Sequence, residues 1–387
     1  LNTQISYRIF DDVLQELPEE NGQFMGKMNW NQKIFGGMIR LTTLYQLTSG
    51  REQKLQFFYQ QVNPGEGIYM HLDFNDDGTE QASEFVLAPT PDQGTHIRVI
   101  YYSDEFIRTD NALFNQNIDI SPKALWYDET GFKKVLSYLS IQSNWQMEQK
   151  VQDKFGTLYW HPLQQNIAEG DIVNDRTNIR NNLWINRGGR KLDVQFSQIF
   201  LDVTNLLTTG LESKTSEEWS SSVRWNVGEK VSLRFTTAVG EKSVSIEQYA
   251  DRSFEVNTQK IVPEISIFPN ENSRLIFKHE SSRFQSLNST EEEGSIQKIS
   301  LESQVSQEWG LVEANINFAQ VDYTGDANSA IGFALLNGLQ KDINYQWTLG
   351  VNRKINKNLR LGLQYEGRKN GNQSIVHTGN IQFSAFF

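Results

Sequence analysis

The chain has 387 residues with a formal net charge of −11, 38% hydrophobic residues, 12% aromatic residues and no cysteine. The absence of cysteine excludes disulfide frameworks and thiolate chemistry. The negative charge argues against nucleic acid as a partner, because binding to a phosphate backbone needs clustered Lys and Arg. No run of about 18 apolar residues is present, which excludes a transmembrane helix. A hydrophobic share below the usual ~45–50%, combined with many aromatics, favours a wall with one apolar face and one wet face.

The first strand pattern lies near the start of the chain. Apolar residues recur largely at every second position on both sides of residues 48–51, which predicts two strands and a turn. The apolar positions are Ile39, Leu41, Tyr45 and Leu47 before the turn and Leu55, Phe57 and Tyr59 after it.

Residues 63–94 are predicted to form an extramembrane insertion that contains one sharp motif. Residues 73–84 match the pattern D-x-[DN]-x-[DN]-G-x5-E of EF-hand calcium loops. Ca²⁺ prefers six to eight oxygen ligands, and Gly78 allows the sharp turn in such a loop. The pattern assigns the oxygen ligands to Asp73, Asn75, Asp77, Thr79 (through its carbonyl), Gln81 and Glu84.

The segments on both sides of this loop have extended rather than helical patterns. We therefore expect an isolated, structural Ca²⁺ loop in a β context, not a helix-pair sensor. The alternative is an acidic surface turn that matches the pattern by chance, since Asp, Asn and Gly are common turn residues.

The region 128–180 is less regular. Residues 128–137 are predicted as a short helix or loop before a strand at about 138–150, and residues 152–175 as a long loop.

The C-terminal half shows the strongest alternation. Apolar residues occupy every second position in segments such as 343–351 and 359–365. Short turns alternate with longer polar stretches such as 284–295 and 322–330. Long amphipathic strands, with short turns at one end and long loops at the other, are typical of transmembrane β-barrels. We therefore predict that residues 1–387 form an all-β, antiparallel transmembrane β-barrel of roughly sixteen strands, or part of a larger barrel, with long extramembrane loops. A soluble sandwich or β-helix is the competing interpretation.

Catalytic motifs are weak. None of the five histidines has a zinc-binding spacing. The sequence His279-Glu280-Ser281-Ser282 places a histidine near serines, but adjacent strand residues point to opposite faces and no oxyanion signature accompanies them. The prediction is a protein without enzymatic activity.

Three stretches resemble one known family. They are residues 49–54; residues 65–88, which contain the Ca²⁺ loop, followed by residues 96–99; and, near the end, residues 336–339, 345–347, 363–368 and 376–379. They are similar to the C-terminal part of a large family of outer-membrane proteins from Bacteroidota. The resemblance covers roughly residues 25–387. It implies an outer-membrane location and a C-terminal piece of a longer polypeptide, and it carries over no catalytic residue.

The predicted function is that of a structural or translocation-type subunit of a cell-envelope complex in the outer membrane of a Gram-negative bacterium. Its expected partners are outer-membrane lipid and envelope proteins. The ordered loop and the irregular middle region favour this prediction, because they indicate extramembrane structure that can make contacts. The alternatives are a porin-like passive channel for small solutes and a barrel enzyme that acts on lipid or surface polymer.

Overall fold

The computed structural model describes residues 2–9, 22–74, 76–152, 169–207, 210–247, 253–288, 292–327, 329–336 and 338–385. These residues form an all-β protein with 18 strands in one sheet. Sixteen of the strands follow one another as an antiparallel meander, and the short strands β4 (Tyr69–His71) and β5 (Phe85–Leu87) lie in the connection between β3 and β6. The predictions of an all-β class, antiparallel pairing and strand number are confirmed. The sixteen strands are β1 (Asn2–Ile9), β2 (Gly22–Ile34), β3 (Ile39–Gln61), β6 (His96–Ile120), β7 (Leu139–Gln152), β8 (Ile172–Ile185), β9 (Leu192–Leu207), β10 (Gly210–Val227), β11 (Val231–Ile246), β12 (Phe254–Asn270), β13 (Ser273–Ser286), β14 (Glu293–Gln307), β15 (Gly310–Tyr323), β16 (Asp342–Lys354), β17 (Leu359–Asn370) and β18 (Val376–Ala385).

The sheet has one apolar face, because side chains alternate between the two faces along each strand. Apolar residues stand opposite one another across neighbouring strands, as in the row Phe277, Leu301, Ile316 and Trp347 from β13 to β16. The first three of these side chains are 45%, 40% and 55% exposed. We call this side the outer face. Its other exposed apolar residues include Trp219, Trp225, Phe235, Val239, Ile261, Ile265, Ile343, Leu349, Leu363, Ile381 and Phe383.

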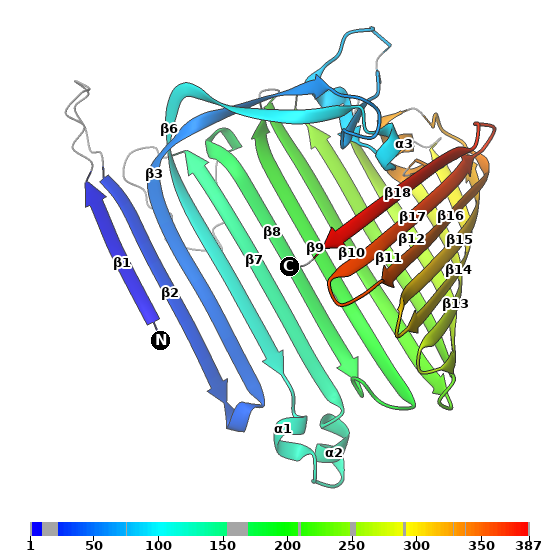
Figure 1. Cartoon of the computed structure of the whole chain (residues 1–387). Coiled ribbons are helices and arrows are strands. Elements are labelled where there is room, and N and C mark those ends of the chain that lie inside the picture. Colours follow the sequence, from blue (N-terminus) through cyan, green and yellow to red (C-terminus); the bar gives the residue numbers. More distant parts are fainter. Residues whose placement is uncertain are drawn as a thin grey trace.

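The opposite, inner face is covered at one end by the helix α3 (Ala330–Leu336). Leu336, which is 2% exposed, packs in a buried cluster with Val256, Phe284 and Val321. Strands β10 to β17 and α3 line a common cavity, so this part of the sheet curls around an interior (Figure 1). The sequence-based prediction did not include α3. Its apolar run lacks polar alternation, and its burial depends on strands that are distant in the chain.

Two short helices, α1 (Lys123–Trp126) and α2 (Phe132–Leu136), connect β6 to β7. Of the short helix or loop predicted for residues 128–137, the structure has the helix, α2, whereas α1 was not predicted. Residues 153–168 of the loop that was expected at 152–175 lie outside the described residues, and β8 begins at Ile172. None of the helices in the described part of the chain is long and apolar enough to cross a membrane.

The two ends of the sheet differ in their connections, as the loop lengths predicted (Figure 1). At the short-turn end, three residues join β10 to β11 and four residues join β16 to β17, and the exception is the connection 121–138 from β6 to β7, which contains α1 and α2. At the opposite, long-loop end, the connection from β15 to β16 contains α3, and the connection from β3 to β6 contains β4 and β5. The polar stretch predicted at 284–295 is shorter in the structure, since β13 extends to Ser286 and β14 begins at Glu293.

The turn predicted at residues 48–51 is wrong. β3 continues through it and pairs with β6 from Ile39 opposite Ile120 to Gln61 opposite His96. β2 accompanies β3 only as far as Ser49, and β7 accompanies β6 only as far as Thr109. The turn-forming residues therefore mark the point at which the β3–β6 ribbon leaves the sheet. A register shift between Gln53 and Leu55 follows this point, and such irregularities bend strands.

The sheet is not a closed barrel within the described residues. β1 pairs with β2 and β18 pairs with β17, and neither strand has a partner on its other side there. Closure depends on how the first and last strands meet. The alternation of side chains within each strand does not encode that geometry.

Gly367 provides a test of the packing on the outer face. A Cβ atom at this position would lie 2.2 Å from the indole ring of Trp347, whereas a Cβ at Gly379 would meet no atom within 4 Å. The substitution Gly367→Ala is therefore expected to lower the free energy of unfolding by about 1–3 kcal/mol, the usual effect of overpacking. Urea unfolding of the protein in lipid vesicles measures the change.

Gly379→Ala on the adjacent strand is the matched control and should stay within about 0.5 kcal/mol of the parent protein. The double variant Gly367→Ala/Trp347→Ala should relieve the overlap. Equal stability of the two single variants would contradict the described packing of Trp347 on Gly367.

Candidate functional site

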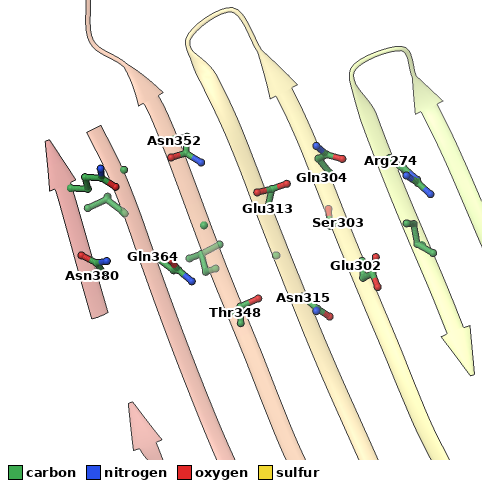
Figure 2. A pocket seen from close by; sticks show the side chains of 17 residues that line it. Arg274, Glu302, Ser303, Gln304, Glu313, Asn315, Thr348, Asn352, Gln364 and Asn380 are labelled. Atoms are coloured by element: carbon green, nitrogen blue, oxygen red, sulfur yellow. The ribbon is translucent and has the colours of Figure 1, made fainter. Parts of the chain in front are cut away.

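The inner face of β13 to β18 is lined mainly by polar side chains. Arg274, Glu302, Glu313, Asn315 and Gln364 all line a cavity of about 430 Å³, and Figure 2 shows them on neighbouring strands. Ion pairs reinforce the inner face here and on neighbouring parts of the sheet: Lys278–Glu302 at 2.7 Å, Lys260–Glu280 at 3.4 Å, and Arg224–Asp193. Polar residues on the inner face and apolar residues on the outer face match a wall between water and an apolar phase.

The β3–β6 ribbon beyond Gly50 and Arg108, together with the residues between the two strands, forms an extension that we call the arm. Inside the arm, Tyr59 stacks on Phe85, with ring centroids 4.1 Å apart and an interplanar angle of 12°. Tyr69 meets Tyr59 edge-on at 5.1 Å. Burial raises the pKa of the Tyr59 hydroxyl. The arm therefore has a small aromatic core of its own.

His96 and Arg98 complete this core. His96 is 4% exposed, and its ring meets Phe85 at 4.8 Å. The guanidinium of Arg98 lies over the rings of Phe57 and Tyr69, at 5.5 and 5.8 Å. Cation–π contacts of this kind add modest stability to a cluster that is already apolar.

The arm bends over the long-loop end and reaches strands that are far away in the sheet order (Figure 1). Asp92 of the arm forms an ion pair with Arg368 of β17, whose side chain is only 8% exposed. Pro89 lies directly against Gly338, since a Cβ at Gly338 would be 2.5 Å from Pro89. The Asn370 amide donates a hydrogen bond of 2.8 Å to the Gly338 carbonyl and holds this segment on β17. These contacts fix the arm to the opposite side of the interior.

The predicted Ca²⁺ loop lies in the arm between β4 and β5. The Gly78 amide donates to Asp73 Oδ2 at 2.9 Å, and Gly78 has the positive φ of +68° that the sharp turn requires. The Thr79 amide donates to Asp77 Oδ1 at 2.7 Å, and the Gln81 side chain donates to Asp77 Oδ2 at 2.7 Å. Asn75 lies outside the described residues.

Glu84 closes the loop from its last position. Its side chain is fully buried, and its Oε2 accepts a hydrogen bond from the Gln81 amide at 3.0 Å. The same oxygen lies 3.0 Å from His71 Nε2. The Leu72 amide donates to the Glu84 carbonyl at 2.9 Å, so the two ends of the loop are tied together.

The fit of these residues to a metal ion is partial. In the described part of the chain, no three acidic or histidine side chains are gathered closely enough to hold one. The pattern also uses amide and carbonyl oxygens as ligands. Two of its ligand oxygens in the described part of the chain make no hydrogen bond and could therefore bind a metal ion. Asp73 Oδ1 and Gln81 Oε1 are buried and have no hydrogen-bond partner there. The donor set is the oxygen-rich kind that Ca²⁺ prefers.

The residues His279 and Glu280 lie on opposite faces of β13. His279 Nε2 is 3.1 Å from Gln297 Oε1, and the Gln297 amide donates to Ser281 at 2.7 Å. Glu280 instead pairs with Lys260 on the inner face. The serine and the histidine are thus joined through a glutamine, and this arrangement does not make a nucleophile–base pair.

Sequence reasoning missed the residues that hold the arm in place. Asp92, Gly338 and Arg368 belong to no motif, and Asp92 and Arg368 are 276 positions apart. Gly338 and Arg368 lie in stretches that carry the family resemblance, but the resemblance assigns no contact to them.

No protein-family profile matches the sequence, and no curated protein matches it. Among solved structures, the ferric yersiniabactin uptake receptor FyuA from Yersinia pestis aligns with 94% of this chain and 66% of its own, at 9% identity and a TM-score of 0.27. The chain thus spans just under two thirds of the length of that receptor. A similarity with this TM-score carries no argument about function.

The ion pair between Asp92 and Arg368 predicts how the arm responds to mutation. Asp92→Asn leaves the buried guanidinium without its carboxylate, which costs about 1–3 kcal/mol. We expect the amides of residues 86–95 to exchange on the order of tenfold faster or more. Hydrogen-exchange mass spectrometry of the full chain measures this change.

Asp193→Asn is the matched control, because it breaks the corresponding pair with Arg224 on the inner face of β9 and β10. It should leave exchange in the arm unchanged. Identical exchange of residues 86–95 in the parent protein and Asp92→Asn would show that the ion pair does not hold the arm.

Proposed function

We propose that the protein is an integral outer-membrane β-barrel that acts as a structural or translocation-type subunit of a cell-envelope complex. The observation that carries this proposal is the combination of an exposed apolar outer face, a polar inner face and an arm that crosses the long-loop end. The first two features support a membrane wall. The third supports a barrel whose interior is partly covered by the arm, not an open pore.

The outer face supports the membrane location. Monomeric soluble proteins rarely expose contiguous apolar patches larger than about 300–600 Å². Here the exposed apolar residues recur on one face from β10 to β18, and Ile316 and Phe383 are 55% and 67% exposed. Strands of 10 to 18 residues in this region are long enough for the ~9–11 residues that cross the hydrocarbon layer.

The free edges of β1 and β18 must be paired if the sheet lies in a membrane. Each unpaired backbone group in hydrocarbon costs several kcal/mol, so an open edge along the 10 residues of β18 would cost on the order of tens of kcal/mol. β1 and β18 run in opposite directions (Figure 1), which is the orientation that antiparallel closure needs. We therefore propose that the sheet closes into a barrel, directly between these strands or through additional strands.

The loop at residues 73–84 is part of the proposal as a structural Ca²⁺ site. Asp73, Asn75, Asp77, Thr79, Gln81 and Glu84 would supply the oxygen ligands. The unpartnered buried oxygens of Asp73 and Gln81 support it. Bound Ca²⁺ would supply positive charge that holds the loop in one shape and stabilises the arm next to the docking segment Pro89–Asp92.

A porin-like passive channel is the second candidate, and the polar inner face favours it. The position of the arm and α3 at the long-loop end favours the subunit instead. The two candidates differ in conductance, because an open pore conducts ions when it is alone in a bilayer.

We expect the full chain, reconstituted alone in a planar bilayer, to show little steady conductance. Replacing residues 62–95 by a short Gly-Ser linker should raise the conductance, because it removes the part of the arm that reaches β17. Single-channel recording measures the difference.

Blue-native electrophoresis of outer membranes should also find the full chain in a species larger than the monomer.

The matched control replaces residues 121–138, which contain α1 and α2 at the short-turn end, by the same linker. This variant should stay closed. A large, steady conductance of the intact chain, together with a monomeric species in the native membrane, would support the porin and contradict the subunit.

Calcium binding is tested by isothermal titration of the chelator-treated full chain. Asp73→Ala removes a charged ligand and should weaken binding on the order of tenfold or more. Asp76→Asn is the control, because Asp76 is not a ligand in the pattern and Asn tolerates its positive φ of +54°. The absence of a Ca²⁺-dependent heat in the parent protein, or equal binding by both variants, would contradict the Ca²⁺ site. The loop would then be an ordinary acidic turn.

A further inference from the structure

A second cavity of about 470 Å³ lies between the inner face, α3 and the end of the arm. Strands from β10 to β17 form its wall, and Pro89 and Thr90 of the arm close one side. Its volume is within the range of ~300–1,000 Å³ that is typical of small-molecule sites. The predicted Ca²⁺ loop contributes none of its wall residues.

The cavity is cationic in a protein that is acidic overall. Two acidic side chains, Glu218 and Glu280, line it against a larger set of basic ones. The basic side chains on the inner face are Lys242, Lys260, Lys298 and Arg368.

Two of these positive charges, on Lys242 and Lys298, have no ion pair of their own among the described residues. Lys260 pairs with Glu280 at 3.4 Å, and Arg368 pairs with Asp92. Glu280 also stands opposite Lys298 in the β13–β14 register, but this carboxylate is already paired with Lys260. For Lys242, the described residues provide no ion-pair partner.

Arg368 gives the clearest sign of a missing acceptor. This residue is 6% exposed, and its Nε–H is buried with no hydrogen-bond partner among the described residues. A buried donor without an acceptor is unfavourable. An anionic oxygen bound in the cavity could accept this hydrogen bond.

The remainder of the lining is apolar. Leu335, Leu336 and Leu339, in and after α3, line the cavity together with Phe284 and Ile296 of the sheet. A bare inorganic anion would leave this surface without a partner. A ligand with an anionic group and an apolar or aromatic body matches both parts of the lining.

We propose that this cavity binds a small amphipathic anion, with its carboxylate or phosphate on the basic wall and its apolar body beneath α3. The inference goes beyond the proposed function and stands on the cavity alone. Binding can be measured whether or not the barrel conducts.

The test uses ¹⁹F NMR of the full chain in lipid nanodiscs with 4-fluorobenzoate as the probe. The controls 4-fluorobenzyl alcohol and 4-fluorobenzylamine have similar shapes but are neutral and cationic. We expect saturable binding of the benzoate with a dissociation constant of roughly 1 mM or tighter, as is reasonable for so small a ligand. The two controls should not saturate.

Lys298→Met keeps the aliphatic chain and removes the charge, so it should weaken benzoate binding at least several-fold, while Lys298→Arg should retain it. The matched control is Lys278→Met, which removes an inner-face lysine on β13 that pairs with Glu302 and does not line this cavity. Its binding should equal that of the parent. Hydrogen-exchange profiles that match the parent outside the cavity confirm that each variant is folded. Equal binding of the three probes, no saturable benzoate binding, or equal loss in Lys298→Met and Lys278→Met would overturn the proposal.

Discussion

The pairing of β3 with β6 along their whole length is the interaction on which the rest of the arrangement depends. At the short-turn end these strands are ordinary members of the meander, held between β2 and β7. Beyond Ser49 and Thr109 the described residues pair these two strands with each other, and only at the far end does Tyr69 of β4 pair with His96. The ribbon bends over the long-loop end (Figure 1). The backbone hydrogen bonds of the wall thus continue into the arm, which gives the arm a rigid base. An arm attached by a flexible linker would lose more conformational freedom when it docks.

The arm and the proposed anion site share the buried side chain of Arg368. The guanidinium of Arg368 pairs with Asp92 of the arm and also lines the cavity beneath α3. A ligand that accepts a hydrogen bond from the Arg368 Nε–H would either weaken or strengthen the ion pair between Arg368 and Asp92, which holds the arm. In either case, ligand binding and arm docking would be coupled through a shared buried group, and such coupling is reciprocal.

The two faces of the sheet have different physical roles. On the outer face, apolar side chains in register across β13 to β16 form a continuous surface, and its exposure is favourable only against an apolar phase. On the inner face, ion pairs and amides face a water-accessible interior, where partial exposure limits the desolvation of their charges. Buried apolar side chains are concentrated at the long-loop end, where α3 packs on the adjacent ends of β11 to β15. The region that is packed most like a globular core is therefore also the region that narrows the interior.

The sequence by itself determined the all-β class, the strand number, the antiparallel order and the difference between the two ends. These features follow from local alternation and turn residues, as in Ile343, Tyr345 and Leu349 on the outer face of β16 and the short connection after Lys354. Only the tertiary structure decided that residues 48–51 lie within a continuous strand, that α3 packs on the inner face and that Asp92 meets Arg368. Each of these depends on a partner far away in the chain: β6 for the strand, Val256 and Val321 for the helix, and β17 for the arm. Local propensity contains no information about such partners, because the favourable contacts exist only after the sheet has curled.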